Sequence, residues 1–163
     1  MASFYERRPE DVFMRALRSL SLLSVCAWLG MAAVPLNADS AFSYALIRPS
    51  CAPWDGGAIE VTLAKEPLKC DRTDGPYLAI GVWKGLPLHD GQEVNFDSRT
   101  NAGFASECTK EGDCERAESG KIVFEKVQQG SEASGHYELH FKGGRILTGK
   151  FDAKWCNDRV FCG

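Results

Sequence analysis

Histidines are the residues of this sequence whose type most readily suggests chemistry. His136 and His140 are four residues apart with Glu138 between them, and His89 stands beside Asp90. On a helix, that spacing would let both imidazoles bind one metal ion. On a strand, residues four apart lie about 13 Å from one another. Because the surrounding residues alternate as in a strand, we expect the two imidazoles to face solvent separately and to bind no metal.

Carboxylates gather in the segment 107–118. They are Glu107, Glu111, Asp113, Glu115 and Glu118. Clustered carboxylates attract calcium, but their spacing here departs from the calcium loop of an EF-hand. We therefore interpret the segment as a solvated hairpin tip closed by a disulfide. Asp71 and Asp74 in "CDRTDG" are expected to serve turn geometry through bonds to the backbone.

Hydrolytic catalysis finds little support in the sequence. A glycosidase needs two carboxylates that come from distant parts of the chain, and nothing singles out one pair here. No arrangement of serine, histidine and aspartate, or of cysteine and histidine, is indicated. We expect no catalytic residue and no cofactor.

Tryptophans are the candidates for binding rather than chemistry. Aromatic side chains on an exposed strand face can form a platform for a sugar or a protein, but core packing is the usual role of such rings. Trp83 and Trp155 lie within or beside apolar runs, and we expect them in the core. Trp54 stands in the turn-rich loop "CAPWDGG", where binding residues are common, and is the binding candidate.

The N-terminal forty residues have the pattern of an export signal. Arg15 and Arg18 precede the uncharged run 20–36, which is followed by the small residues Ala38 and Ser40. A basic start, an apolar stretch and small residues at a cleavage site are typical of a secretory signal. We expect cleavage near Ser40, no stable membrane span afterwards, and a periplasmic, secreted or cell-surface protein.

Two alternatives for this segment remain open. Its apolar run, 20–36, is at the lower limit for a membrane-spanning helix, so it could stay as an uncleaved anchor. A lipid on Cys26 is the weaker alternative, because valine precedes that cysteine in place of a small residue. With cleavage, the chain divides into 1–40, an extension and signal peptide, and 41–163, a single disulfide-linked domain.

Six of the seven cysteines follow the signal segment. They are Cys51, Cys70, Cys108, Cys114, Cys156 and Cys162. An even number of cysteines in a small exported domain indicates a disulfide framework. The spacing matches no zinc finger, because no C-x-x-C pair occurs. Cys108 and Cys114 are separated by five residues that include Gly112, and we pair them across a turn.

The other four cysteines allow two arrangements. In the first, Cys51 pairs with Cys156 and ties the first strand to the last, while Cys70 pairs with Cys162 and fixes the C-terminal tail. In the second, the bridges are local, Cys51 with Cys70 and Cys156 with Cys162. A bridge that closes a longer loop removes more entropy from the unfolded chain.

After the signal segment, apolar and polar residues alternate in several short runs, as is typical of strands. Apolar and polar residues alternate in 57–65 and 135–141, whereas 75–85 is apolar on both faces, which is typical of a strand covered on both sides. Strands are also expected at 93–96, 102–108, 120–130 and 146–155. Gly143 and Gly144 predict a tight turn with two positive φ angles, and Gly149 predicts a bulge or a close approach. The fold class is all-β, a small antiparallel β-sandwich or barrel with disulfides, preceded by an N-terminal signal helix.

The segments "SGKIVFEKVQQGSEASGHYELHFKGGRILTGKFDAKWC" and "ALIRPSCAPWDGGAIEVTL" resemble uncharacterised secreted proteins and lipoproteins of Gram-negative bacteria. The residues that carry the resemblance are Gly135, Tyr137, Leu139, Phe141, Gly149, Phe151, Ala153 and Cys156. In the second segment, an apolar strand leads to a cysteine. The resemblance implies a disulfide-linked β-sandwich and no particular activity.

These observations limit the function. The net charge is −3, and without a clustered basic face we expect no nucleic-acid partner. The prediction is an exported, non-catalytic module that binds a protein or a glycan in the periplasm or at the cell surface. A small inhibitor of a hydrolase is the alternative, and a small secreted hydrolase ranks below it.

Overall fold

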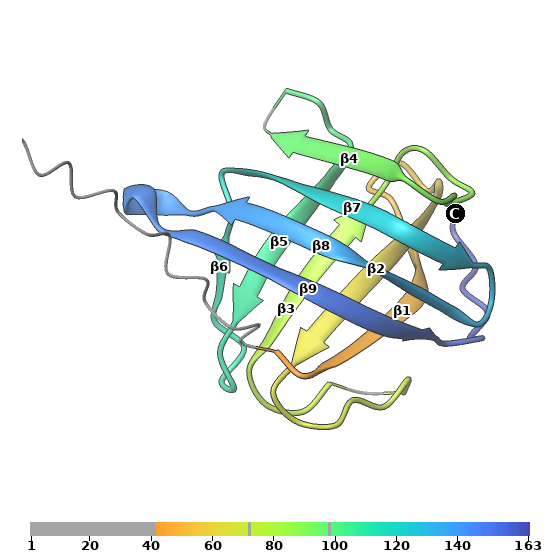
Figure 1. Ribbon diagram of the computed structural model, residues 1–163, viewed down its shortest axis with the longest axis horizontal. Helices are drawn as coiled ribbons and strands as arrows, with labels where there is room; N and C mark the ends of the chain where they lie inside the picture. Colours follow the sequence, from red (N-terminus) through yellow and green to blue (C-terminus); the bar gives the residue numbers. More distant parts are fainter. Residues whose placement is uncertain (1–41, 72, 98) are drawn as a thin grey trace, which may run out of the picture. The chain divides into compact units, whose positions relative to one another are not determined.

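A computed structural model describes residues 42–163 except 72 and 98 (Figure 1). The predicted signal helix and its cleavage site lie outside the described residues. The elements are β1 (Tyr44–Cys51), β2 (Gly57–Ala64), β3 (Tyr77–Val82), β4 (Gln92–Asp97), β5 (Gly103–Cys108), β6 (Cys114–Arg116), β7 (Ser119–Gln128), β8 (Glu132–His140), the short 3-10 helix η1 (Lys142–Gly144) and β9 (Ile146–Trp155). The all-β prediction is confirmed. Within the described part, no helix is long and apolar enough to cross a membrane.

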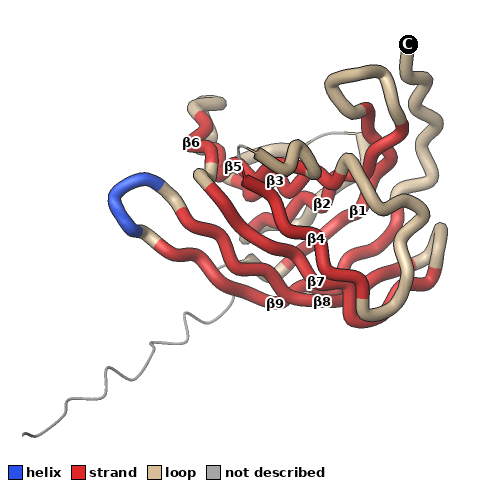
Figure 2. The backbone as a smooth tube through the Cα atoms, turned by 90° about the horizontal axis from the view of Figure 1, so that it is seen from above, coloured by secondary structure: helices blue, strands red, loops and turns tan. Residues whose placement is uncertain are grey.

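The nine strands of the described residues belong to one open sheet, in the order β4-β7-β8-β9-β1-β2-β3-β5-β6. The sheet curls so that β4, β7, β8 and β9 cross over β1, β2, β3 and β5 (Figures 1 and 2). One pair, β1 with β9, is parallel, with Ala45 beside Ala153, and the other pairs are antiparallel. The expected purely antiparallel arrangement is therefore wrong at this pair, because no local pattern marks a pairing between the first and last strands.

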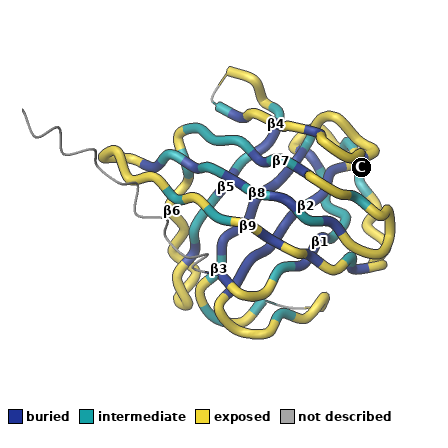
Figure 3. Tube along the Cα trace, in the orientation of Figure 1, coloured by how far each residue is buried: buried dark blue, intermediate teal, exposed yellow. Residues whose placement is uncertain are grey.

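The core lies between the two halves of this sheet (Figure 3). Every second residue of β8 is buried, and β4 shows the same alternation, so alternate residues of these strands face inward. The strand β3 is buried on both faces, as predicted. Among the side chains that are almost fully buried are Ile47, Val61, Leu63, Leu78, Ile80, Val82, Ile122, Phe124, Tyr137, Leu139 and Phe141.

Glycines at the β8–β9 hairpin behave as their sequence predicts. Gly143 and Gly144 adopt φ angles of 75° and 81° at the tip of the hairpin (Figure 2), a conformation that suits glycine. Gly149 is a close approach and not a bulge, because the hydroxyl of its cross-strand partner Tyr137 occupies the place of a Cβ. The bulge lies instead in β7, between Phe124 and Lys126.

Tyr137 carries a buried hydroxyl that has no hydrogen-bond partner among the residues that the structure describes. Burial, with a smaller contribution from the charge of Glu107, raises the pKa of Tyr137 to about 12. An unpartnered buried hydroxyl costs about 1–3 kcal/mol of desolvation. Removing the hydroxyl oxygen of Tyr137 should therefore stabilise the folded state.

We expect Tyr137→Phe to raise the free energy of unfolding by about 1–3 kcal/mol, measured by urea denaturation at neutral pH. Since the pKa of the folded state lies above the ordinary value of 10.0, wild-type stability should also fall as the pH rises through about 10 to 12, and the variant should lack that component. The half-buried Tyr77, changed to Phe, serves as control and should shift stability by less than about 0.5 kcal/mol. A loss of stability in Tyr137→Phe would contradict the assignment.

The disulfides confirm one predicted pair and correct the others. Cys108 is joined to Cys114 across the β5–β6 hairpin, as expected. Cys51 pairs with Cys162, and Cys70 pairs with Cys156, each with a Cα separation of 5.6 Å. Both arrangements expected for these four cysteines, Cys51–Cys156 with Cys70–Cys162 and the local one, are therefore wrong.

The parallel register of β1 and β9 explains the correction. The amide of Cys156 donates to the carbonyl of Ile47, so Cys156 lies beside the middle of β1. Cys51 is at the end of that strand, roughly 10 Å further along, which exceeds the Cα separation of a disulfide. The tail after β9 runs on in the same direction and brings Cys162 to Cys51.

Candidate functional site

The outer face of the β2–β3–β5 region carries aromatic side chains. Ile80 and Val82 of β3 pack in the core, so the residues that alternate with them, Gly81 and Trp83, face away from it. The same alternation turns Phe104 outward, because its neighbour Ala105 is a core residue. On this face Ala58, Thr62 and Ala79 are buried, so its exposed part is the end that carries the aromatic residues.

Three rings form a continuous row, here called the aromatic strip: Trp54, Trp83 and Phe104. The ring centroids of Trp54 and Trp83 are 5.9 Å apart, with the rings at 83°. Those of Trp83 and Phe104 are 5.5 Å apart at 40°. Trp54 is 46% exposed, and the other two rings are half-buried. The strip therefore presents aromatic surface that the protein itself does not cover.

Glycines make room for the strip. The Phe104 ring lies directly over Gly81, where a Cβ would collide with three ring atoms. The indole of Trp54 rests in the same way against Gly56. The rings of Trp54 and Phe104 are thus set against backbone, which limits their motion.

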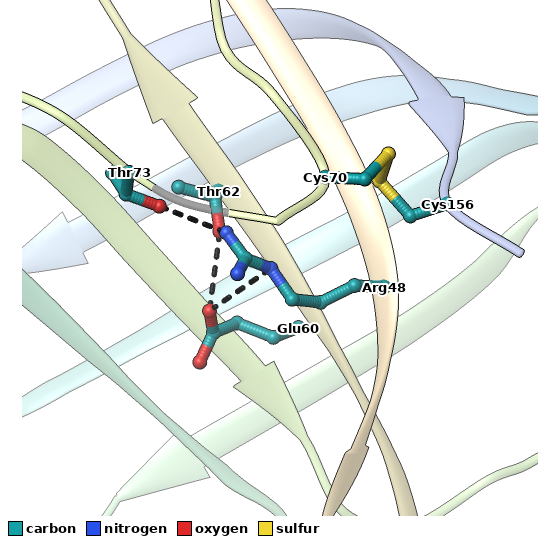
Figure 4. Close-up of a disulfide and its surroundings, with 6 residues drawn as sticks. All are labelled: Arg48, Glu60, Thr62, Cys70, Thr73 and Cys156. Carbon is teal, nitrogen blue, oxygen red and sulfur yellow. Dashed lines mark hydrogen bonds and ion pairs between the residues drawn. A yellow bond between two sulfur atoms is a disulfide. The ribbon is translucent and has the colours of Figure 1, made fainter. Parts of the chain in front are cut away.

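A polar network joins β1, β2 and the loop before β3 (Figure 4). Arg48 donates through Nη2 to Thr62 Oγ1 at 3.1 Å and to Thr73 Oγ1 at 2.9 Å. The Thr62 hydroxyl donates to Glu60 Oε1 at 3.1 Å, and the buried Arg48 Nε lies 3.7 Å from the same oxygen. The network therefore fixes the Glu60 carboxylate in one orientation.

Register connects this network to the strip. Arg48 pairs with Glu60, Glu60 with Gly81, and Gly81 with Phe104, so these residues form one row across four strands. Neighbouring strands are about 4.8 Å apart. Within this row Gly81 separates Glu60 of β2 from Phe104 of β5.

Arg116 of β6 lies over the Phe104 ring. Its guanidinium carbon is 5.6 Å from the centroid of the Phe104 ring. A recess of about 300 Å³ opens between these two side chains and the end of β4. Its lining residues are Phe96, Asp97, Gly103, Phe104, Arg116, Ala117 and Glu118.

Of the sequence candidates, Trp54 lies in the strip and is exposed. Trp83 was expected in the core, and this expectation is wrong. The run 75–85 is apolar on both faces of the strand, and Trp83 lies on the outer face. Trp155 is partly buried and packs against the core, as expected. Sequence reasoning missed Phe104, Arg116 and Glu60, because only strand register brings them beside the tryptophans.

The histidines are not brought together. His136 Nδ1 lies 2.9 Å from Glu125, and His140 Nε2 lies 2.9 Å from Glu138, so each has its own carboxylate partner. His89 Nδ1 lies 3.1 Å from the carbonyl of Asp90. The three imidazoles therefore share no partner.

Two carboxylates of the acidic segment have a structural role. Arg145 binds Glu107 and Glu115 at 2.6 Å each, and its guanidinium carbon lies 4.0 Å from the centroid of the Phe141 ring. The arginine thus joins the β8–β9 hairpin to the β5–β6 hairpin. These two carboxylates hold the two hairpins together.

One group of metal-ligand type occurs next to a disulfide. Cys70, Cys156 and Asp158 place three ligand-type atoms within 4.8 Å of one another. The two sulfurs are bonded to each other, however, and a disulfide supplies no thiolate for a metal. The group therefore supports a structural role.

Comparison of the chain with protein-family models, with curated proteins and with solved structures finds no match. The candidate site therefore rests on the geometry of the strip and of the polar residues on its face.

Proposed function

We propose that this protein is an exported, non-catalytic module that binds a glycan chain through the aromatic strip. The observation that carries the proposal is the row formed by Trp54, Trp83 and Phe104 on an outer sheet face. The apolar C–H faces of sugars stack on aromatic rings, while polar groups at the edge bond the hydroxyls. Arg116, whose guanidinium lies over the Phe104 ring, provides such a group.

Binding without catalysis is supported by the place of the strip. It lies on the outside of a curled sheet, whereas enzymes that cleave bonds enclose the reacting atoms and exclude water. The Glu60 carboxylate on the same face is bonded to Thr62 and lies beside Arg48. A carboxylate held in this way is suited to accepting hydrogen bonds from a ligand.

Export and architecture belong to the same proposal. Three disulfides in a domain of this size are typical of the periplasm, the cell surface or the extracellular space, and the resemblance to secreted proteins of Gram-negative bacteria points the same way. Since a single sheet holds all nine strands, we favour an incompletely closed barrel over a sandwich of two separate sheets.

The test measures, by calorimetry, the affinity of the protein for soluble hexasaccharides of glucose and of N-acetylglucosamine. We expect Trp54→Ala to weaken binding about tenfold, because an aromatic contact is worth roughly 1.5 kcal/mol. Ile146→Ala, which removes an exposed apolar side chain of β9 outside the strip, serves as control and should bind as the wild type does.

Equal affinity of Trp54→Ala and wild type would contradict the proposal, as would the absence of binding to every glycan tested. A protein captured from envelope extract in a manner that depends on Trp54 would favour the protein-binding alternative instead, since tryptophan and arginine are frequent at protein interfaces.

A further inference from the structure

We propose that the β5–β6 hairpin is a redox-sensitive cover of the aromatic strip. While the Cys108–Cys114 bridge is closed, β6 holds Arg116 over the Phe104 ring. Reduction of the bridge by a dithiol releases β6 and uncovers the ring. Access to this part of the strip then depends on the redox state of one bridge, whatever ligand the strip takes.

The first step is the position of the Phe104 ring between two neighbours. The ring rests against the backbone of Gly81, where a Cβ would collide with it. The guanidinium carbon of Arg116 lies 5.6 Å from the centroid of the ring. A ligand therefore cannot stack on the part of the ring that the guanidinium covers until the arginine moves away.

The second step is the register of β6. Arg116 is the cross-strand partner of Ser106, and Cys114 is the partner of Cys108. Side chains two residues apart share one face of a strand, so the bridge lies on the same face as Arg116 and Phe104. Arg116 stands diagonally across from Phe104, a position from which long side chains reach one another. The bridge thus fixes the strand two residues away from the arginine.

The third step is what holds β6 in place. It is the last strand in the order of the sheet, and its three residues are exposed. On the other face of the hairpin, Arg145 bonds Glu107 and Glu115 at 2.6 Å each. All three side chains are more than a third exposed, and exposed ion pairs contribute little to stability. The bridge is therefore the stronger of the two restraints on β6.

The fourth step is the chemistry of release. Cys114 is exposed and Cys108 is buried, so a thiolate of the dithiol attacks Cys114 Sγ and forms a mixed disulfide, while Cys108 leaves and takes up a proton. The second thiol of the reductant then attacks the reductant's own sulfur in the mixed disulfide, which frees Cys114. Two electrons and two protons pass to the protein, and the reductant becomes a cyclic disulfide.

The fifth step is that the reduced protein stays folded. The Cys108–Cys114 bridge spans 6 positions, whereas the bridges Cys51–Cys162 and Cys70–Cys156 span 111 and 86. In the loop-entropy account, a bridge that closes a short loop stabilises the fold least. Opening it therefore changes the hairpin and leaves the rest of the sheet in place, as a switch requires.

The experiment separates the bridge from the ion pairs. The wild type is compared with the double variant Cys108→Ala and Cys114→Ala, which imitates the reduced state, and with Arg145→Gln, which removes the ion pairs and keeps the bridge. The wild type is also treated with dithiothreitol, a dithiol. Alkylation of free thiols followed by peptide mapping identifies the opened bridge, and circular dichroism shows whether each sample is folded.

Two NMR measurements report the position of β6. The nuclear Overhauser effect between protons of Arg116 and of the Phe104 ring shows whether the guanidinium covers the ring. Exchange of the Ala117 amide, which donates to the carbonyl of Ala105 across the hairpin, shows whether β6 is paired. The Gly91 amide, which donates to a carbonyl of β7 elsewhere in the sheet, is the control for a general loss of stability.

We expect the contact between Arg116 and Phe104 in the oxidised wild type and in Arg145→Gln. It should be lost in the double variant and in the reduced wild type. In both of these the Ala117 amide should exchange about tenfold faster or more, and the Gly91 amide should change by less than about twofold, because exchange reports local opening.

A contact that survives in either the double variant or the reduced wild type would overturn the inference. Loss of the contact in Arg145→Gln would do so too, because the ion pairs would then be the restraint. The same holds if either open form is unfolded, or if dithiothreitol unfolds the protein before it opens the Cys108–Cys114 bridge. None of these measurements uses a glycan, so the cover and the proposed function can fail separately.

Discussion

Replacing Cys51 and Cys162 together by alanine is expected to lower the free energy of unfolding by roughly 4.8 kcal/mol at 25 °C. The bridge joins residues 111 positions apart, which is nearly the whole described domain. A link of this length removes much of the conformational entropy of the unfolded chain, and its loss therefore destabilises the folded state strongly. Substituting both cysteines leaves neither partner of this bridge as a free thiol that could pair elsewhere.

The matched comparison is the double variant Cys108→Ala and Cys114→Ala. That bridge spans only six positions, and the same entropy model gives about 2.2 kcal/mol. Urea denaturation of both variants, with the remaining bridges confirmed by peptide mapping without reductant, should separate them by about 2.6 kcal/mol. Equal losses would contradict the loop-length account, and peptides linking Cys51 to another cysteine would contradict the pairing.

The second large effect is expected at Gly135 in the middle of β8. A Cβ at this position would run into the carbonyl oxygen of Val123 on β7 and would lie 3.1 Å from the Phe151 ring. The carbonyl belongs to a paired strand and cannot rotate away as a flexible side chain would. We expect Gly135→Ala to lower the free energy of unfolding by roughly 3 kcal/mol, the upper part of the range for overpacking.

Gly57→Ala is the matched control for this change. Gly57 also lies in a strand, β2, but a Cβ there would meet nothing within 4 Å. Alanine has less freedom than glycine in the unfolded chain, so this variant should be neutral or more stable by up to about 1 kcal/mol. Urea denaturation of the two variants checks the prediction, which fails if Gly135→Ala is as stable as the control.

The sequence alone determined the local structure of this protein. Alternation predicted the strands now seen as β2, β8 and β9, because period two follows directly from the geometry of an extended chain. The apolar run around β3 correctly indicated burial on both faces. The pair Gly143 and Gly144 predicted the turn between β8 and β9, since positive φ angles favour glycine. The close pair Cys108–Cys114 was also predicted, because the two residues belong to one hairpin.

Part of the candidate site was likewise visible in the sequence. Trp54 stood out because it occupies a loop, where exposure is the rule. Trp83 was assigned to the core because alternation shows which residues share a face and does not show which face the rest of the protein covers. The polar residues on the same face, Glu60 and Arg116, had no signal of their own.

Only the tertiary structure decided the long-range arrangement. The parallel contact of β1 with β9 placed Cys156 beside Ile47, so that Cys51 pairs with Cys162 instead. No local sequence pattern predicts that register. The row from Glu60 across Gly81 to Phe104 likewise depends on how three strands are aligned, and a shift of one residue would turn every side chain to the other face. Local chemistry therefore fixed the strands and turns, and the alignment between strands created the disulfide framework and the aromatic strip.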